Sequence, residues 1–243
     1  QIPENYCGGA ATALSTSTTG EDMFVNYNDF RDAGGNEIEV GDAATVTANT
    51  GTVSLDRSVY PVPFTSAHYK QHDDVMISEG NITLTVTVAD ADYDLNPSGE
   101  DTIAAGVVTI YGYRGDKSAT LESNFALTET APSSGVFEYE FTLNASATGN
   151  SVLTNLRQGD VITATYTDPT DASGNSYVNV DSSTLDLRTG SLLSDKSVYV
   201  IGSDAIITIV DADLNLDSGT IESYTLDLVE WDSDAGTAVS YTH

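Results

Sequence analysis

Apolar and polar side chains alternate along several short segments of the chain. In residues 82–88, Ile82, Leu84, Val86 and Val88 alternate with three threonines. Successive side chains of a strand point to opposite faces of a sheet, so this period of two predicts a strand with one buried face. Similar patterns predict further strands at residues 107–113, 137–143, 162–166 and 183–187.

Turn-forming residues separate the predicted strands. Pro, Gly, Ser, Asn and Asp cluster at residues 97–99, 115–116, 132–135 and 172–175. Only the segment 65–74, "TSAHYKQHDD", is compatible with a helical turn. Several short strands joined by such turns predict an all-β chain of antiparallel β-sandwich modules of immunoglobulin-like type.

The chain repeats itself. Residues 20–60 align with residues 159–199 without a gap, with about fifteen identities that include "Y-x-D-x-x-D-A-x-G-N" and "D-R/K-S-V-Y". Each pair in this alignment is 139 positions apart, as Tyr27 and Tyr166 are. Further on, "VADADYDLN" (88–96) aligns with "IVDADLNLD" (209–217) at an offset of 121, so the earlier copy contains about eighteen additional residues. A repeat of this length predicts tandem modules.

The repeat predicts three parts. Residues 1–49 form the C-terminal part of one immunoglobulin-like module, residues 50–188 form a complete module with an insert near 61–80, and residues 189–243 form the N-terminal part of a further module. Two interpretations remain open. The chain is a segment of a longer array, or the partial modules obtain their missing strands from neighbouring chains.

Acidic residues dominate the charge. The chain has 37 acidic and 8 basic side chains, which gives a formal net charge of −29. No basic surface is available to replace the counterions of nucleic acid, and anionic membranes would be repelled. No apolar run is long enough to span a bilayer, so we expect no direct membrane insertion by this segment. Such charge must be tolerated, screened by salt or neutralised by bound cations.

Two acidic loops per module are candidate Ca²⁺ sites. Carboxylates at alternating loop positions can converge on one ion, which needs six to eight oxygen ligands. The alternative is that Asp and Asn close turns and hydrate the surface. The first acidic loop supplies Asp90, Asp92, Asp94 and Asn96, and in the next module Asp211, Asp213, Asn215 and Asp217. The second acidic loop supplies Asp168, Asp171 and Asn175, and in the preceding module Asp29, Asp32 and Asn36.

The first acidic loop is read as one half of a junction site. Asp168 and Asp171, or Asp195 of the next module, are candidates to complete it. The motif of residues 56–60 that opens the module predicts a first strand with a turn aspartate. The functional alternative is that this motif supplies a metal ligand that joins the module to the acidic loop of the preceding module.

Few residues suggest other chemistry. His68 and His72 have the spacing of two ligands on a helix, but a surface turn with two exposed histidines is favoured. Cys7 is the only cysteine, which excludes an internal disulfide. No nucleophile motif or phosphate loop is present, so no enzyme is expected. Asn81 and Asn144 begin N-glycosylation sequons.

The order of the phrases is similar to the tandem modules of archaeal surface-layer proteins, particularly those of ammonia-oxidising archaea. The phrases are "D-R/K-S-V-Y", "DADYDLN", "LTETAPSSGVF" and "GDVITATYTDPTD", and the resemblance covers nearly the whole chain. It departs in the insert and at Phe30, which replaces a proline.

The resemblance implies a secreted, glycosylated structural protein at the cell surface. Its modules would self-assemble into a porous lattice in which calcium joins modules or subunits and acidic pores concentrate small cations. Two alternatives remain: an extracellular filament or adhesion subunit built by strand exchange, and a calcium-dependent carbohydrate-binding module of a secreted protein.

Overall fold

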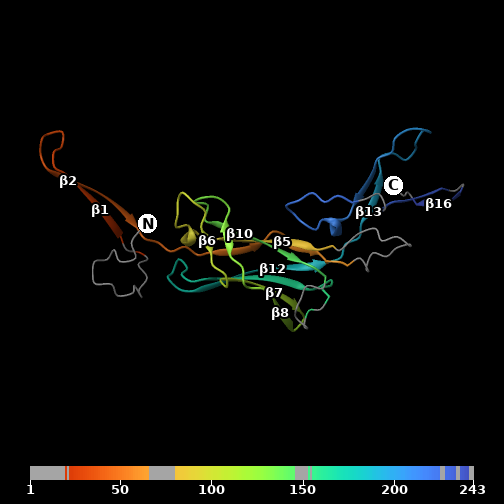
Figure 1. The fold of residues 1–243 in the computed structure, drawn as a ribbon, viewed down its shortest axis with the longest axis horizontal. Coiled ribbons are helices and arrows are strands. Elements are labelled where there is room, and N and C mark those ends of the chain that lie inside the picture. The colour runs from red at the N-terminus through yellow and green to blue at the C-terminus, as the bar shows by residue number, and fades with distance from the viewer. Residues whose placement is uncertain are drawn as a thin grey trace.

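The structure is a computed structural model. It describes residues 20, 22–65, 80–145, 153, 155–224, 228–233 and 236–240. A β-sandwich lies at the centre, with β-hairpins before and after it along the chain (Figure 1). Within the described residues, no helix is long and apolar enough to cross a membrane.

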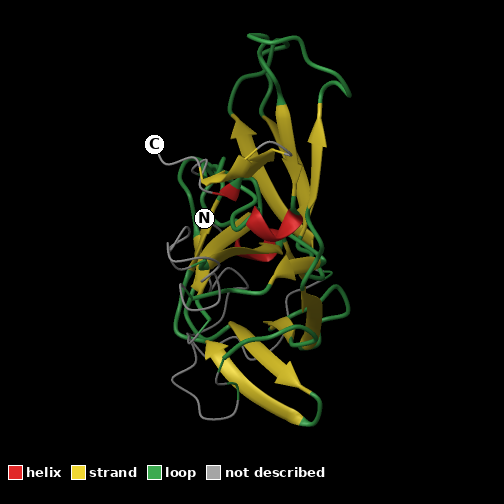
Figure 2. Cartoon of the chain, turned by 90° about the vertical axis from the view of Figure 1, so that its right-hand side faces the viewer, coloured by secondary structure: helices red, strands yellow, loops and turns green. Residues whose placement is uncertain are grey.

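Two five-stranded sheets form the sandwich. The first has the order β3 (Thr52–Leu55), β5 (Ile82–Ala89), β10 (Val136–Leu143), β9 (Leu127–Glu129) and β6 (Thr102–Ile103). The second has the order β4 (Val59–Pro61), β12 (Tyr177–Asp186), β11 (Val161–Asp168), β7 (Val108–Arg114) and β8 (Lys117–Glu122). Every pairing is antiparallel except that of β4 with β12, which is parallel. Strands and loops make up nearly all of the described chain, with only short helical turns (Figure 2).

The core lies between the two sheets. The four alternating apolar residues of β5 are fully buried, and the threonines between them are only partly buried. Ile162 and Tyr166 of β11 contribute to the core from the other sheet. The predicted strand faces are therefore confirmed, because the alternation places each apolar side chain away from water.

The predicted all-β class is confirmed, and the immunoglobulin-like assignment stays a prediction. Four predicted strands match β5, β7, β10 and β11 to within a residue or two. The fifth, β12, begins at Tyr177, six residues earlier than predicted; Val178 and Val180 alternate with polar residues in this added half, but both are exposed. Two 3-10 turns lie wholly within the described residues, η1 (Ala91–Tyr93) and η2 (Ala212–Leu214). Except for Thr65, the predicted helical turn at 65–74 lies outside the described residues.

The flanking hairpins repeat parts of the sandwich. They are formed by β1 (Asp22–Asp29) with β2 (Ile38–Thr45), β13 (Ser191–Ser194) with β14 (Ile207–Val210), and β15 (Glu230–Ser233) with β16 (Gly236–Ser240). Ser191 pairs with Val210 as Thr52 pairs with Ala89, which is the register that the two sequence offsets require. All sandwich strands lie within residues 50–188, and these hairpins lie outside that range.

Candidate metal site and joint between modules

The first acidic loop begins with a buried carboxylate. Asp90 caps η1, because its Oδ1 accepts a hydrogen bond from the Asp92 amide at 2.9 Å. The hydroxyl of Tyr166 donates to Asp90 Oδ2. Burial raises the pKa of Asp90 although the Tyr166 hydrogen bond opposes this effect, and the charge of Asp168 adds to the increase.

The second acidic loop approaches the first around Gly51. Asp168 is buried, and its Oδ2 accepts a hydrogen bond from the Gly51 amide at 2.8 Å. A Cβ atom at Gly51 would lie 2.5 Å from Asp90 Oδ2 and 2.6 Å from the Tyr166 ring. Only glycine fits there. The two loops therefore come together at one end of the sandwich, although their oxygens already accept hydrogen bonds from the protein.

Asp92 holds the segment that enters the sandwich. Its carboxylate accepts hydrogen bonds from the Asn49 amide at 3.0 Å and from the Asn49 side chain at 2.7 Å. The following module repeats this contact, because Asp213 accepts a hydrogen bond from the Arg188 amide at 2.8 Å and pairs with the Arg188 guanidinium at 3.2 Å. Asn49 and Arg188 are 139 positions apart, so the same side chain holds the linker in both copies.

Three carboxylates form the one group among the described residues with metal-ligand spacing. Asp94, Asp101 and Glu129 each place one oxygen within 4.8 Å of the others. Asp94 follows η1, Asp101 precedes β6 and Glu129 ends β9, so three segments supply the group. Asp101 Oδ2 accepts hydrogen bonds from the amides of Leu95 and Asn96, both at 2.7 Å.

Glu129 is the buried member of this acidic triad, with 2% of its surface exposed. Its Oε2 accepts a hydrogen bond from the Asp101 amide at 2.9 Å, and its Oε1 accepts hydrogen bonds from the amides of Ser134 and Gly135. These amides, the Asp101 amide most strongly, lower the pKa of Glu129. The carboxylate therefore stays charged at neutral pH. Carboxylate oxygens suit a hard cation, so the triad could hold a metal ion.

The sequence did not single out Asp101 or Glu129. The signal was present in the repeat, because an acidic residue, Glu222, lies 121 positions after Asp101 and binds the equivalent pair of backbone amides. Its Oε1 accepts hydrogen bonds from the amides of Leu216 and Asp217, both at 2.6 Å. The position equivalent to Glu129 would fall after residue 243, and Asn215 replaces Asp94, so the described second copy has fewer carboxylates.

The other predicted ligands lie in turns. Asp171 Oδ1 accepts hydrogen bonds from the amides of Ser173 and Asn175, both at 2.9 Å. Asp32 makes the same turn with the amides of Gly34 and Asn36. One predicted ligand, Asp211, caps η2, and others each accept hydrogen bonds from nearby backbone amides: Asp29, Asn96 and Asp217. Asp195 is bonded within its own copy of the opening motif, where its Oδ1 accepts hydrogen bonds from Tyr199 and the Ile206 amide.

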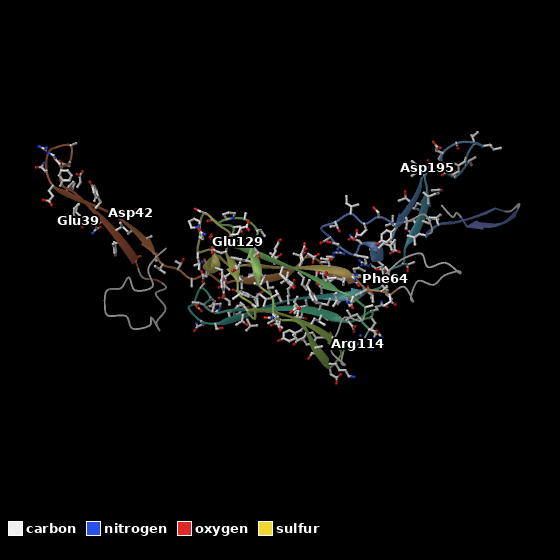
Figure 3. All side chains as sticks on the ribbon, viewed as in Figure 1. Glu39, Asp42, Phe64, Arg114, Glu129 and Asp195 are labelled. Atoms are coloured by element: carbon white, nitrogen blue, oxygen red, sulfur yellow. The ribbon has the colours of Figure 1, made fainter. Side chains whose placement is uncertain are left out.

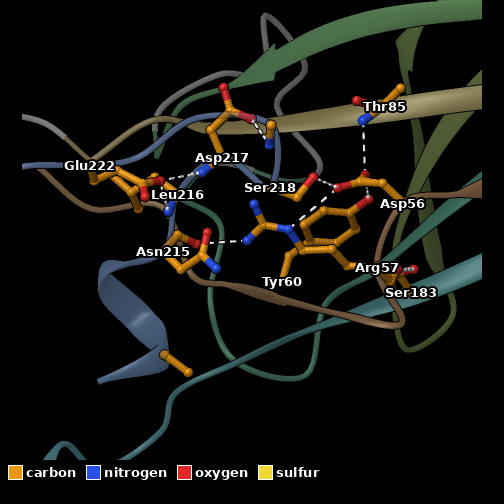
Figure 4. Close-up of polar contacts among 12 residues, drawn as sticks. Asp56, Arg57, Tyr60, Thr85, Ser183, Asn215, Leu216, Asp217, Ser218 and Glu222 are labelled. Atoms are coloured by element: carbon orange, nitrogen blue, oxygen red, sulfur yellow. Dashed lines mark hydrogen bonds and ion pairs between the residues drawn. The ribbon is translucent and has the colours of Figure 1, made fainter. Parts of the chain in front are cut away.

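The opposite end of the sandwich carries a joint with the next module (Figure 4). The Ser218 hydroxyl donates to Asp56 Oδ2 at 2.6 Å, and Arg57 Nη1 donates to the Asn215 carbonyl at 2.7 Å. The Thr83 amide donates to the Leu216 carbonyl at 3.0 Å. The opening motif therefore joins the acidic loop of the following module, and the predicted junction with the preceding loop is wrong. Asp56 lies at the far end of β3 from Gly51, where the chain enters.

Residues 56–60 form a corner that is held by hydrogen bonds to Asp56 and by the contact of Arg57 with the Tyr60 ring. The Tyr60 hydroxyl donates to Asp56 Oδ1, as does the Thr85 amide at 2.9 Å. Burial alone would raise the pKa of Asp56, but the hydrogen bonds from Ser218, Tyr60 and Thr85, together with the Arg57 charge, lower it. Arg57 lies over the Tyr60 ring, 5.7 Å from its centroid. Its Nε lies 3.3 Å from Asp56 Oδ2 without hydrogen-bond alignment.

The two sequons occupy neighbouring strand ends. Asn81 is exposed directly before β5, and Asn144 is half-buried directly after β10. Their glycosylation stays a prediction. Cys7, His68 and His72 lie outside the described residues.

No family model matches this chain, and neither does any curated protein.

Proposed function

We propose that the chain belongs to a structural protein of an archaeal cell surface, in which tandem immunoglobulin-like modules assemble into a calcium-stabilised, strongly acidic, porous surface layer. The observation that carries this proposal is the joint between successive modules. A loop of one module is bonded to a corner of the previous one, and copies of both surfaces recur along the chain. Repeated modules with defined joints suit a protein that builds extended structures.

The strand order supports the module type. In the first sheet β3, β5, β10 and β9 are neighbours, and in the second sheet β12, β11 and β7 are neighbours. Immunoglobulin-type sandwiches have this arrangement, with their first, second, fifth and fourth strands in one sheet and their last two beside the third in the other. Such modules carry function in their loops and assembly surfaces, which agrees with the location of the joint.

Calcium is the cation that we assign to the acidic triad. Asp94 and Asp101 are only partly buried, so water can complete a coordination sphere of six to eight oxygens. A bound divalent ion would relieve the repulsion between three carboxylates and part of the charge of −29. Asp94 begins the loop of residues 94–97, and Asp101 holds that loop through two amide hydrogen bonds. A bound ion would therefore also stiffen this loop.

Titration of the purified chain with CaCl₂, followed by calorimetry, tests the ion. We expect Asp94→Asn to weaken binding at least about tenfold, since it removes one of three charged ligands. No hydrogen bond of the Asp94 carboxylate is found among the described residues, so this variant should stay folded. Asp116→Asn, in the exposed turn between β7 and β8, is the matched control. Equal calcium affinity in both variants would remove the triad from the proposal.

Electron microscopy with and without a chelator tests the assembly. A planar lattice that is lost in chelator supports the surface layer. Dispersed monomers would instead favour a carbohydrate-binding module of a larger secreted protein. The small cations that the acidic surface should concentrate can be measured in the same preparations, before and after Asp and Glu are neutralised.

A filament built by strand exchange is the second candidate. The hairpin β1–β2 exposes several large apolar side chains, of which Phe24, Val25 and Tyr27 are each at least 60% exposed. Both strands of this two-stranded sheet are edge strands, so they can pair with strands from another chain, which would also cover the apolar face. Fibres in the micrographs, in place of sheets, would support this candidate.

A further inference from the structure

Each surface of the joint occurs a second time in the chain. The docked loop is Asn215–Ser218, and its counterpart is the loop Asp94–Pro97 of the sandwich. The occupied corner is Asp56–Tyr60, and its counterpart is Asp195–Tyr199. Among the described residues, the counterparts do not contact one another, since they lie in parts of the structure far apart in Figure 1.

The second corner is already formed. The Tyr199 hydroxyl donates to Asp195 Oδ1 at 2.5 Å, as Tyr60 does to Asp56. Lys196 lies 5.6 Å from the centroid of the Tyr199 ring, which is the position of Arg57 over Tyr60. The difference is in coverage, because the Lys196 side chain is 53% exposed and the Arg57 side chain only 14%.

The second loop is also already formed. Asp101 holds the amides of Leu95 and Asn96 at 2.7 Å, as Glu222 holds those of Leu216 and Asp217 at 2.6 Å. Leu216 packs against the core of the sandwich, whereas Leu95 is 66% exposed. The loop therefore presents an exposed apolar side chain and backbone carbonyl groups in the arrangement that binds a corner elsewhere in the same molecule.

We propose that the loop Asp94–Pro97 of one chain docks on the corner Asp195–Tyr199 of a second copy of this chain. Leu95 would cover the apolar side chains at the corner, where Val198 and Val200 are 79% and 78% exposed. Lys196 would donate to the Asp94 carbonyl, as Arg57 donates to that of Asn215. Pro97 stands where Ser218 does, so the hydroxyl bond to the corner aspartate has no counterpart and the contact is weaker than the internal joint.

The geometry makes this association head-to-tail. Glu129, beside the loop, lies at one end of the sandwich, and Asp195, in the corner, lies beyond the other end (Figure 3). Two different surfaces at opposite ends leave each added copy with one free loop and one free corner, which generates open chains. Because each copy carries a charge of −29, screening by salt should strengthen the association. Calcium is not required, so this inference is independent of the metal site.

Sedimentation velocity in EDTA with added NaCl tests the contact. We expect the mean mass of the wild-type chain to rise with concentration. Leu95→Asp disables the loop and Lys196→Glu disables the corner. The dissociation constant for self-association should therefore rise at least tenfold in each variant. A mixture of the two should form dimers and nothing larger, because one working loop meets one working corner. Val178→Asp and Lys117→Glu, both at exposed positions, should associate like the wild type.

Two results would overturn the proposal. One is a wild-type chain that stays monomeric at every concentration and salt. The other is association that persists unchanged in both Leu95→Asp and Lys196→Glu, which would assign the contact to the apolar hairpins. Neither result bears on calcium binding or on the joint within the chain, because the experiment excludes the ion and leaves Arg57 and Asp56 intact.

Discussion

The sandwich and the hairpin β1–β2 have related sequences but different surroundings. Tyr166 of β11 is fully buried, whereas its counterpart Tyr27 in β1 is 60% exposed. Both strands pair with their partners over eight residues in the equivalent register. A strand pair therefore forms from its own sequence and turn. Burial of its apolar face needs the second sheet, because a two-stranded hairpin alone is only marginally stable in water.

The buried Tyr166 should contribute far more to stability than its exposed counterpart Tyr27. Tyr166→Ala should lower the free energy of unfolding by about 3–5 kcal/mol, since it leaves a cavity in the core and removes the hydrogen bond to Asp90. Tyr27→Ala should change it by less than about 0.5 kcal/mol. Urea denaturation of both variants measures the difference. Similar losses in the two variants would mean that the hairpin is packed as the sandwich is.

The joint should give an intermediate effect. Arg57→Ala removes the hydrogen bond to the Asn215 carbonyl, a bond from a charged group worth about 1.5–3 kcal/mol. The linker should then be released more often, and trypsin should cleave after Arg188 about tenfold faster. Mass spectrometry of timed digests at high dilution identifies this cut. Lys196→Ala, at the exposed corner, should leave the rate unchanged, and acceleration by both variants would contradict the assigned joint.

Two buried carboxylates with opposite pKa shifts, Glu129 and Asp90, should change the pH dependence of stability in opposite directions. Glu129 has a lowered pKa, so its contribution to stability is complete above its ordinary value of 4.5 and is lost as the pH falls through the pKa of the folded state. Asp90 has a raised pKa, so its destabilising effect at neutral pH disappears on acidification. Urea midpoints between pH 7 and pH 3 should fall less steeply for Glu129→Gln and more steeply for Asp90→Asn than for the wild type. Identical slopes in both variants would contradict these shifts.

The smallest effect concerns the turns of the second acidic loop. Asn can accept the same hydrogen bonds as Asp but lacks the charge, and the hydrogen bonds from Ser173 and Asn175 lower the pKa of Asp171. Because this turn is exposed, Asp171→Asn should lower the urea midpoint at neutral pH only slightly. Calcium affinity should be unchanged, because the acidic triad contains no residue of this loop. A lower affinity in this variant would restore Asp171 as a ligand.

The acidic loops show where prediction from the sequence stopped. Alternating aspartates from residue 90 onward suggested one shared ion, but each side chain has a separate task. Asp90 caps a turn, Asp92 holds Asn49, and Asp94 faces carboxylates from two other segments. Spacing along a loop does not determine direction, because the 3-10 turn rotates successive side chains away from one another. Glu129 could not be paired with Asp94 before the neighbouring strands were known.

Five strands of the sandwich and the repeat could be predicted from the amino-acid sequence alone, because they depend on alternation and turn residues within a few positions. Which carboxylates meet, and which loop contacts the Asp56 corner, became clear from the three-dimensional fold. Those contacts join residues up to 162 positions apart. They depend on which segments the fold brings to the same end of the sandwich, and local sequence patterns do not specify this.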